Sequence, residues 1–363
     1  MTDFELPAFF VGTRKGLFQL ARQADGRWSP AGHDFVGDPV TQLLHDPRDG
    51  CLYAALNLGH FGPKLHRLAP GESQWQEIAC PAFDESDGAS VKEIWALEAG
   101  GADQPGRLWA GTIPGGLFRS DDSGASWQLV RSLWEDPGRE KWFGDGADEP
   151  AIHSICVHPD DSRELILGVS CGGAWQSHDD GATWAQVAHG MRAAYLPEEQ
   201  SLEPDSQDPH MIVRCPAQPS ELWCQHHNGI FKRSGDEEWT EVTTAPVSAF
   251  GFGCVVHPED AQRAWFVPGN SDQCRLPVDA AIVVQHTRDG GASFEVQREG
   301  LPQSHAYDIV LRHALAIDAS GERLAFGSTC GGLWVTEDGG QHWQIQDMRL
   351  PPVYVVAWQQ PAD

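Results

Sequence analysis

Short runs of apolar and β-branched residues recur along the whole chain, and glycine-rich turns separate them. Runs that pass through such a turn into a second strand occupy residues 11–18, 110–118, 168–175, 225–231 and 327–334. Further apolar runs precede several of these, at residues 152–158, 212–215, 254–257 and 308–317. Short apolar runs bounded by turn residues are typical of β-strands. The pattern therefore predicts an all-β chain, with four strands per repeated unit from the second unit onward.

An aromatic residue closes each turn-and-strand unit, and these residues recur about every fifty positions. They are Trp28, Trp75, Trp127, Trp184, Trp239, Phe294 and Trp343. A repeat of this length is typical of a β-propeller, because one four-stranded blade cannot bury its two faces alone. The repeats therefore predict a seven-bladed β-propeller.

Four of these aromatics end a Ser/Thr-x-Asp-x-Gly-x-x-aromatic pattern. It is clearest at residues 120–127 and 177–184, looser at residues 287–294 and 336–343, and decayed before Trp28, Trp75 and Trp239. The Asp carboxylate can accept hydrogen bonds from the amides of its own turn, and the Gly can take a positive φ. The aromatic would then pack between neighbouring sheets. The pattern predicts hairpin turns with a structural role.

These four turns resemble the Asp box, or BNR repeat, of sialidases, sortilin-like receptors, some xyloglucan hydrolases and photosystem assembly factors. The resemblance extends over essentially the whole chain as repeats, and it implies a propeller of the sialidase and sortilin-like superfamily. It implies fold rather than activity, because the box is structural in all of these groups. The chain is not a typical sialidase: residues 112–114 echo the Arg-Ile-Pro signature of that family without its arginine.

The first repeat lacks an inner strand, because it begins directly with its second strand at Phe9. Residues 353–358 form an apolar run at the far end of the chain and can supply the missing strand. Pairing the two ends would remove the open edge that a split ring leaves. We therefore expect one domain over residues 1–363, closed by the C-terminal strand.

The turns of a propeller divide between two faces. If strands are lettered A to D from the channel outward, the A–B and C–D turns share one face, which includes the Asp-box turns. His45, His158 and His257 belong to A–B turns, where we expect a turn-stabilising role. The D–A and B–C loops form the opposite, top face. Several of them are long, and long loops in a compact ring are usually functional.

Polar side chains from every blade are expected to converge at the top mouth of the channel, where substrate contacts and shifted pKa values are expected. The predicted catalytic residues are Glu149, His153, His210, Arg275 and Tyr307. The predicted substrate-binding residues are Arg14, Lys15, Asn57, His60, Glu93, His227, Asn270 and His305.

Three functions fit this mouth. The resemblance favours a glycosyl hydrolase-like or lyase-like carbohydrate-active enzyme, with arginines for an acidic substrate. The alternative is a non-catalytic binding or assembly module, whose partner or sugar would meet Trp134, Trp142, Phe143 and Phe61, all expected to be exposed. The third is a metal site. Imidazole and carboxylate groups are ligands of zinc, manganese or iron, and His153, His210 and His226 are the predicted ligands of a divalent ion, with Asp208 or Glu149 beside them.

Charge and cysteine content limit which partners and which cellular compartment are expected. The formal net charge is −27, from 25 Lys+Arg against 52 Asp+Glu. Such a surface repels phosphate backbones and anionic lipid heads, so we expect neither nucleic acid nor a membrane as partner. The nine cysteines form no CxxC pair and the N-terminus shows no signal-peptide pattern, which favours the cytoplasm. We expect a small-molecule or carbohydrate ligand at the top face of a monomer or small homo-oligomer.

Overall fold

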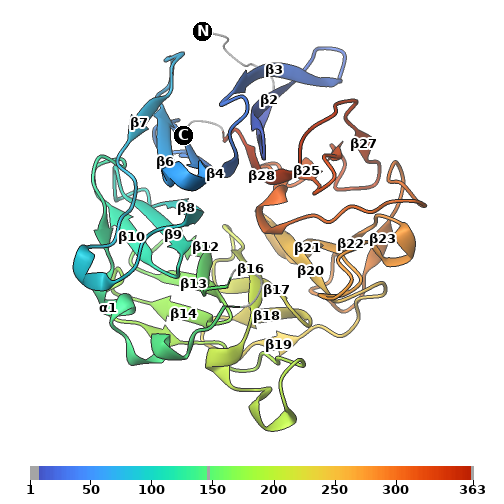
Figure 1. Cartoon of the computed structure of the whole chain (residues 1–363). Coiled ribbons are helices and arrows are strands. Elements are labelled where there is room, and N and C mark those ends of the chain that lie inside the picture. The colour runs from blue at the N-terminus through green and yellow to red at the C-terminus, as the bar shows by residue number, and fades with distance from the viewer. Residues whose placement is uncertain (1–7, 145–147, 361–363) are drawn as a thin grey trace.

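The computed structural model describes residues 8–144 and 148–360. Within them, seven four-stranded antiparallel sheets stand side by side in a ring around a central channel (Figure 1). The predicted seven-bladed propeller is therefore confirmed. The predicted single domain over residues 1–363 extends at both ends into positions that lie outside the described residues.

The first four blades follow the chain in order. Blade one contains β28 (Val353–Trp358), β1 (Ala8–Thr13), β2 (Gly16–Arg22) and β3 (Trp28–Asp34). Blade two contains β4 (Val40–His45), β5 (Leu52–Asn57), β6 (Pro63–Leu68) and β7 (Gln76–Ile78). Blade three contains β8 (Glu93–Ala99), β9 (Leu108–Ile113), β10 (Leu117–Ser120) and β11 (Gln128–Leu129). Blade four contains β12 (Ala151–Val157), β13 (Leu165–Ser170), β14 (Gly173–Ser177) and β15 (Ala185–Gln186).

The remaining blades complete the ring. Blade five contains β16 (Pro209–Arg214), β17 (Glu221–His226), β18 (Ile230–Ser234) and β19 (Thr240–Glu241). Blade six contains β20 (Gly251–His257), β21 (Asp260–Pro268), β22 (Val284–Thr287) and β23 (Glu295–Gln297). Blade seven contains β24 (Leu315–Ile317), β25 (Leu324–Gly327), β26 (Leu333–Thr336) and β27 (Gln344–Ile345).

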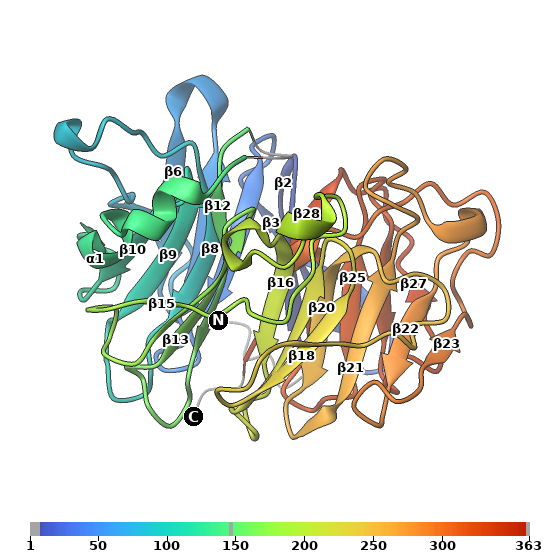
Figure 2. The ribbon, with the colours of Figure 1, turned by 90° about the horizontal axis from the view of Figure 1, so that it is seen from below.

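Helices are short and lie in the loops. They are α1 (Arg131–Trp134) and the 3₁₀ helices η1 (Gly59–Phe61), η2 (Glu85–Asp87), η3 (Pro137–Lys141), η4 (Glu198–Gln200), η5 (Pro204–Ser206), η6 (Val278–Ala280) and η7 (Arg312–Ala314). In the side view, coiled ribbons gather on the upper side of the ring, which is the top face (Figure 2). Among the described residues, no helix is both long and apolar enough to cross a membrane.

The ring closes where the two ends of the chain pair. Strand β28 runs antiparallel to β1, in a register that joins Phe9 to Trp358. The rings of Phe9, Trp28 and Trp358 pack with centroids 4.9 to 5.5 Å apart. On the other side of β28, blade seven approaches so closely that a Cβ on Gly327 would lie 2.4 Å from the Val353 side chain. Close packing on both sides of β28 therefore seals the ring.

The four Ser/Thr-x-Asp turns share one hydrogen-bond pattern. In the first, the Asp122 carboxylate accepts the Ser120 hydroxyl and the Ser126 amide, each at 2.8 Å. Asp179, Asp289 and Asp338 repeat these contacts. The glycines that follow take φ values of 81° to 94°, as predicted.

Three of the indoles that close the repeats donate hydrogen bonds to the preceding blade. The Nε1–H groups of Trp127, Trp184 and Trp239 donate to Ala79 O, Ser132 Oγ and Val187 O respectively. These three aromatics therefore fasten their blades to the preceding ones, whereas the Nε1–H groups of Trp75 and Trp343 have no hydrogen-bond partner among the described residues.

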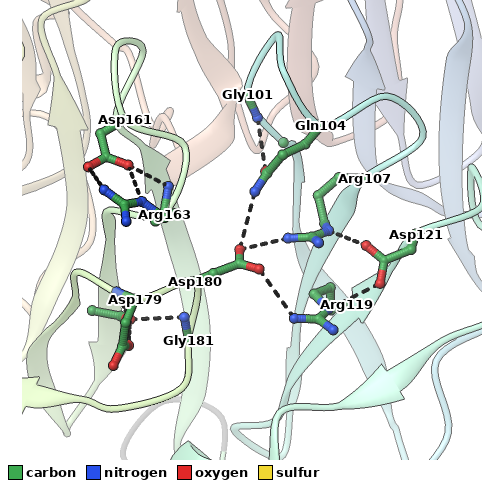
Figure 3. A network of polar contacts seen from close by, with 12 residues as sticks. Gly101, Gln104, Arg107, Arg119, Asp121, Asp161, Arg163, Asp179, Asp180 and Gly181 are labelled. Carbon is green, nitrogen blue, oxygen red and sulfur yellow. Dashed lines mark hydrogen bonds and ion pairs between the residues drawn. The ribbon is translucent and has the colours of Figure 1, made fainter.

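Ion pairs add to the joint between blades three and four on the bottom face (Figure 3). Arg107 binds Asp180 at 2.6 Å and also pairs with Asp121. Arg119 approaches the same Asp180 at 3.4 Å. Because Asp180 belongs to the C–D turn of blade four and both arginines belong to blade three, the network ties two consecutive blades.

Two of the three A–B turn histidines accept amides of their own turns, whereas His45 Nδ1 accepts the amide of Gln360 near the other end of the chain. His158 Nδ1 accepts the amides of Asp160 and Asp161 at 3.1 and 3.2 Å. His257 Nδ1 accepts the amide of Glu259 at 3.0 Å. The expected turn role of these two residues is confirmed.

Three expectations need correction. Trp134 was expected at the surface, but it is half-buried and packs against Phe83 and Arg139. The run 308–317 was predicted to be one inner strand, but only β24 (Leu315–Ile317) is a strand, and η7 (Arg312–Ala314) precedes it. Trp142 was expected at the surface, but its indole is 7% exposed and packs edge-on against Trp175. An aromatic in a long loop therefore belongs to the core here.

Replacement of Trp358 by alanine tests the closure. The side chain is 3% exposed and packs on two other aromatic rings, so we expect a loss of about 3–5 kcal/mol in the free energy of unfolding. Urea denaturation measures it. The control is Phe61→Ala, whose ring is 77% exposed and whose effect should stay within about 0.5 kcal/mol. Equal effects of the two substitutions would contradict a closing role for Trp358.

Candidate functional site

Two adjoining cavities occupy the central channel, with volumes of about 440 Å³ above and about 360 Å³ below. His313 lines both of them. The upper cavity lies at the top mouth, where B–C turns and the first residues of inner strands meet. Its lining residues are Arg14, Pro39, Thr41, Asn57, Gly59, Glu93, Trp95, Leu311, Arg312, His313 and Tyr354.

Arg312 is the central cation of this cavity. Helix η7 holds it at the entry to β24, with its guanidinium carbon 4.7 Å from the Trp95 ring centroid and 5.4 Å from that of Phe252. Burial lowers its pKa to about 10, so it remains charged at neutral pH. Its Nε has no hydrogen-bond partner among the described residues. A buried donor without a partner is costly, which is a reason to expect a ligand beside it.

A carboxyl group and a phenol face the same cavity. The Asn57 amide donates to Glu93 Oε2 at 2.8 Å, while burial raises the pKa of Glu93. Burial also raises the pKa of Tyr354, and the nearby charge of Arg14 opposes that rise. Of the described residues that line this cavity, Glu93 alone carries a carboxylate. The cavity thus combines arginines with one carboxyl group that binds its proton more tightly than an exposed one.

A second cluster lies at the top of blade five. Asp208 Oδ2 is 3.3 Å from His210 Nε2 and 3.1 Å from His227 Nδ1, and all three side chains are buried. Burial alone would raise the pKa of Asp208, but His210, His227 and Arg312 together hold it well below its usual range. Phe252 stacks on His210 with centroids 4.7 Å apart. The same Phe252 ring touches Arg312, so the cluster and the upper cavity are neighbours.

The other two predicted metal ligands lie differently. Both ring nitrogens of His226 face backbone amides, those of Asp208 and Asn228, each at 3.1 Å. Burial lowers its pKa to about 3, so the ring is neutral. His153 lines the lower cavity, with Nδ1 2.9 Å from the Ser154 hydroxyl. Of the three predicted ligands, only His210 belongs to the cluster with Asp208 and His227.

The structure separates the remaining predicted residues into groups. Arg14, Asn57 and Glu93 line the upper cavity. Glu149 forms an ion pair with Lys92. Arg275 lies with its guanidinium carbon 5.5 Å from the Phe252 ring. The exposed predicted residues outside the cavity wall are Lys15, His60, Asn270, His305 and Tyr307.

Four cavity residues were not predicted as site residues: Trp95, Arg312, His313 and Tyr354. Arg312, His313 and Tyr354 fall in the runs 308–317 and 353–358, which were predicted as inner strands, and Trp95 lies in the inner strand β8. The sequence does contain one indication of Arg312. It is a cation within an otherwise apolar inner-strand run, and a buried cation requires a partner.

The fold is shared with known structures. The propeller resembles an ancestral GH74 enzyme (TM-score 0.59, 14% identity, 88% of this chain and 38% of that one). It also resembles the GH74 xyloglucanase of Xanthomonas campestris (TM-score 0.62, 17% identity, 98% of this chain and 53% of that one). A third similar structure is that of YCF48 from Cyanidioschyzon merolae (TM-score 0.59, 13% identity, 93% of this chain and 92% of that one). This chain thus spans only about half or less of the length of each of the two GH74 enzymes.

At these identities the likeness concerns the fold alone. No model of a known protein family matches the sequence, and no curated protein matches it at a significant level. Function therefore has to be argued from the site.

The lower cavity yields a prediction on stability. Burial raises the pKa of Glu98 to about 7, from 4.5 in the unfolded chain. The native state therefore holds a proton that the unfolded state releases, and its stability falls as pH rises from 4.5 to about 7.

Glu98→Gln removes this charge. We expect the variant to be more stable than the wild type by about 3 kcal/mol near pH 8, and no more stable near pH 4. Urea denaturation at both pH values measures the difference. The control is Glu237→Gln at an exposed turn, which should change the stability by the same amount at both pH values. A Glu98→Gln effect that does not depend on pH would contradict the prediction.

Proposed function

We propose that this chain is a carbohydrate-active enzyme that binds an acidic sugar in the upper cavity. The observation that carries the proposal is Arg312, a charged guanidinium in the cavity wall whose Nε has no hydrogen-bond partner among the described residues. Arginine binds carboxylates through paired, charge-assisted hydrogen bonds. The aromatic wall of Trp95 and Tyr354 suits the apolar face of a sugar ring.

The charge distribution supports an anionic ligand of small size. The chain as a whole carries a formal charge of −27, which repels large anions. Arg14 and Arg312 nevertheless line one cavity of about 440 Å³ that contains a single described carboxyl group. A uronate unit meets both conditions, since its carboxylate can enter alone while the rest of the sugar is neutral.

Elimination fits the cavity better than hydrolysis. Glycosidases that use two carboxyl groups place them about 5–5.5 or about 6.5–9.5 Å apart, and the described lining of this cavity provides Glu93 alone. Elimination from a uronate requires only that a cation neutralise the carboxylate, that a base remove the neighbouring proton and that an acid protonate the leaving oxygen.

The side chains of the cavity can divide these tasks. Arg312 and Arg14 bind the carboxylate. His313 donates from Nε2 to His153 O at 2.8 Å, which leaves Nδ1 without a proton and makes it the proposed base. Glu93, with its raised pKa, is the proposed acid. The base takes the proton next to the carboxylate, a carbon–carbon double bond forms, and the glycosidic oxygen leaves with the proton from Glu93.

Arg312→Leu tests binding. A charge-assisted hydrogen bond contributes about 1.5–3 kcal/mol, so we expect the dissociation constant for a uronate oligosaccharide to rise about 10- to 150-fold. Isothermal titration calorimetry measures it, with a neutral oligosaccharide of the same length as reference. Arg163→Leu removes an arginine that pairs with Asp161 on the bottom face, and it should leave binding unchanged. Tighter binding of the neutral sugar would rule out an acidic ligand.

Glu93→Gln tests chemistry. We expect turnover of the uronate oligosaccharide to fall about 10²- to 10⁴-fold while the dissociation constant changes little, because the variant cannot donate the proton. Ultraviolet absorbance of the unsaturated product measures turnover, and exposed Glu72→Gln is the control. Release of reducing ends without an unsaturated product would support hydrolysis instead. Binding of the uronate without any turnover would support the non-catalytic binding module.

A further inference from the structure

The cluster at the top of blade five contains more hydrogen-bond acceptors than its protons can satisfy. His210 Nδ1 lies 2.6 Å from the carbonyl oxygen of Gly251, which can only accept, so this nitrogen carries the proton. The other nitrogen, Nε2, then directs its lone pair at Asp208 Oδ2, 3.3 Å away. Two acceptors face each other there without a proton between them.

His227 repeats the arrangement. Its Nδ1 lies 3.1 Å from Asp208 Oδ2 and its Nε2 lies 3.5 Å from Asp272 Oδ2. A neutral imidazole carries one proton, so its two carboxylate contacts have a single proton to share. The two neutral imidazoles bring two protons to four contacts with three oxygen acceptors.

We propose that a divalent transition-metal ion binds here, with Asp208 Oδ2, His210 Nε2 and His227 Nδ1 as its ligands. One cation at their meeting point replaces both missing protons. It lets His210 donate to Gly251 and His227 donate to Asp272. Its two positive charges also balance the two carboxylates of Asp208 and Asp272.

The distances fit one ion. Ligand atoms about 2.0–2.2 Å from a shared metal lie about 3.0–3.5 Å from one another in octahedral or tetrahedral geometry. The contacts of Asp208 Oδ2 measure 3.3 and 3.1 Å, and the three ligand atoms lie within 4.8 Å of one another. Little movement is therefore needed to bind a metal.

The surroundings hold the ligands in place. Asp208 Oδ1 accepts the Ser170 hydroxyl and the Cys171 amide, each at 3.2 Å, which leaves Oδ2 for the ion. The Gly251 carbonyl and the Asp272 carboxylate orient the two imidazoles, the outer contacts that metal-binding histidines usually have. Two nitrogens and one carboxylate oxygen suit zinc, manganese or iron, and three protein ligands leave at least one position open to water or a ligand.

The first test measures metal content. The chain, produced without a histidine tag, should contain about one equivalent of a transition metal by plasma mass spectrometry. After chelation, calorimetric titration with Zn²⁺ or Mn²⁺ should show saturable one-to-one binding and a rise in melting temperature. If neither ion shows saturable binding, the proposal is overturned, and protons rather than a metal occupy the space between these side chains.

Variants locate the site. Asp208→Asn should weaken Zn²⁺ binding more than about 100-fold, and Asp272→Asn about 10- to 100-fold. Asp272 has a side chain that is 41% exposed, so its variant remains informative if Asp208→Asn does not fold. The matched control is His342→Gln, which removes an Asp–His pair on the opposite face, with Nδ1 2.6 Å from Asp338. Zn²⁺ binding that Asp272→Asn leaves unchanged would overturn the assignment.

Metal binding is measured without any sugar, so this inference does not rest on the proposed function. A chain that binds Zn²⁺ but no uronate, or a uronate but no metal, would separate the two.

Discussion

The pairing of β28 with β1 is the constraint on which the whole ring depends. Each blade packs mainly on its two neighbours, so an unpaired inner strand in blade one would expose the edge of β1 and leave a flank of blade seven uncovered. The closure also brings together residues distant in sequence: Arg14 from the first turn, Tyr354 from the last strand and Arg312 from blade seven line one cavity only because the ends meet. The site is thus a product of closure.

The two faces of the ring differ in how their conformation is determined. On the bottom face, carboxylates and imidazoles bind the amides of their own turns, as Asp122 and His158 do, so local sequence decides the conformation of these turns, and ion pairs such as Arg107–Asp180 join one blade to the next. On the top face, side chains bind partners from other blades. Asn57 of blade two holds Glu93 of blade three, and Phe252 of blade six lies between Arg312 of blade seven and His210 of blade five. Such contacts depend on the closed ring.

This difference explains what the sequence could predict. The repeat near fifty residues and the turn motifs predicted the fold and its closure, because both are local signals repeated along the chain. The site was predicted in part: Arg14, Asn57 and Glu93 were placed at the mouth, and they line the cavity. Arg312 and His313 were missed because a channel-facing residue and a core residue look alike in an apolar run. His226 and His227 show most clearly what the sequence cannot predict about the site, since successive residues at a strand end point to different sides. One reaches backbone amides and the other reaches Asp208.

The two polar sites at the mouth complement each other electrostatically. Arginines in the wall of the upper cavity favour an anion, whereas Asp208 and Asp272 beside the two imidazoles favour a cation. Phe252 contacts both, with Arg312 5.4 Å from its ring centroid and His210 stacked on it at 4.7 Å. A molecule that spans the ring of Phe252 would therefore meet a guanidinium at one end and two carboxylates at the other.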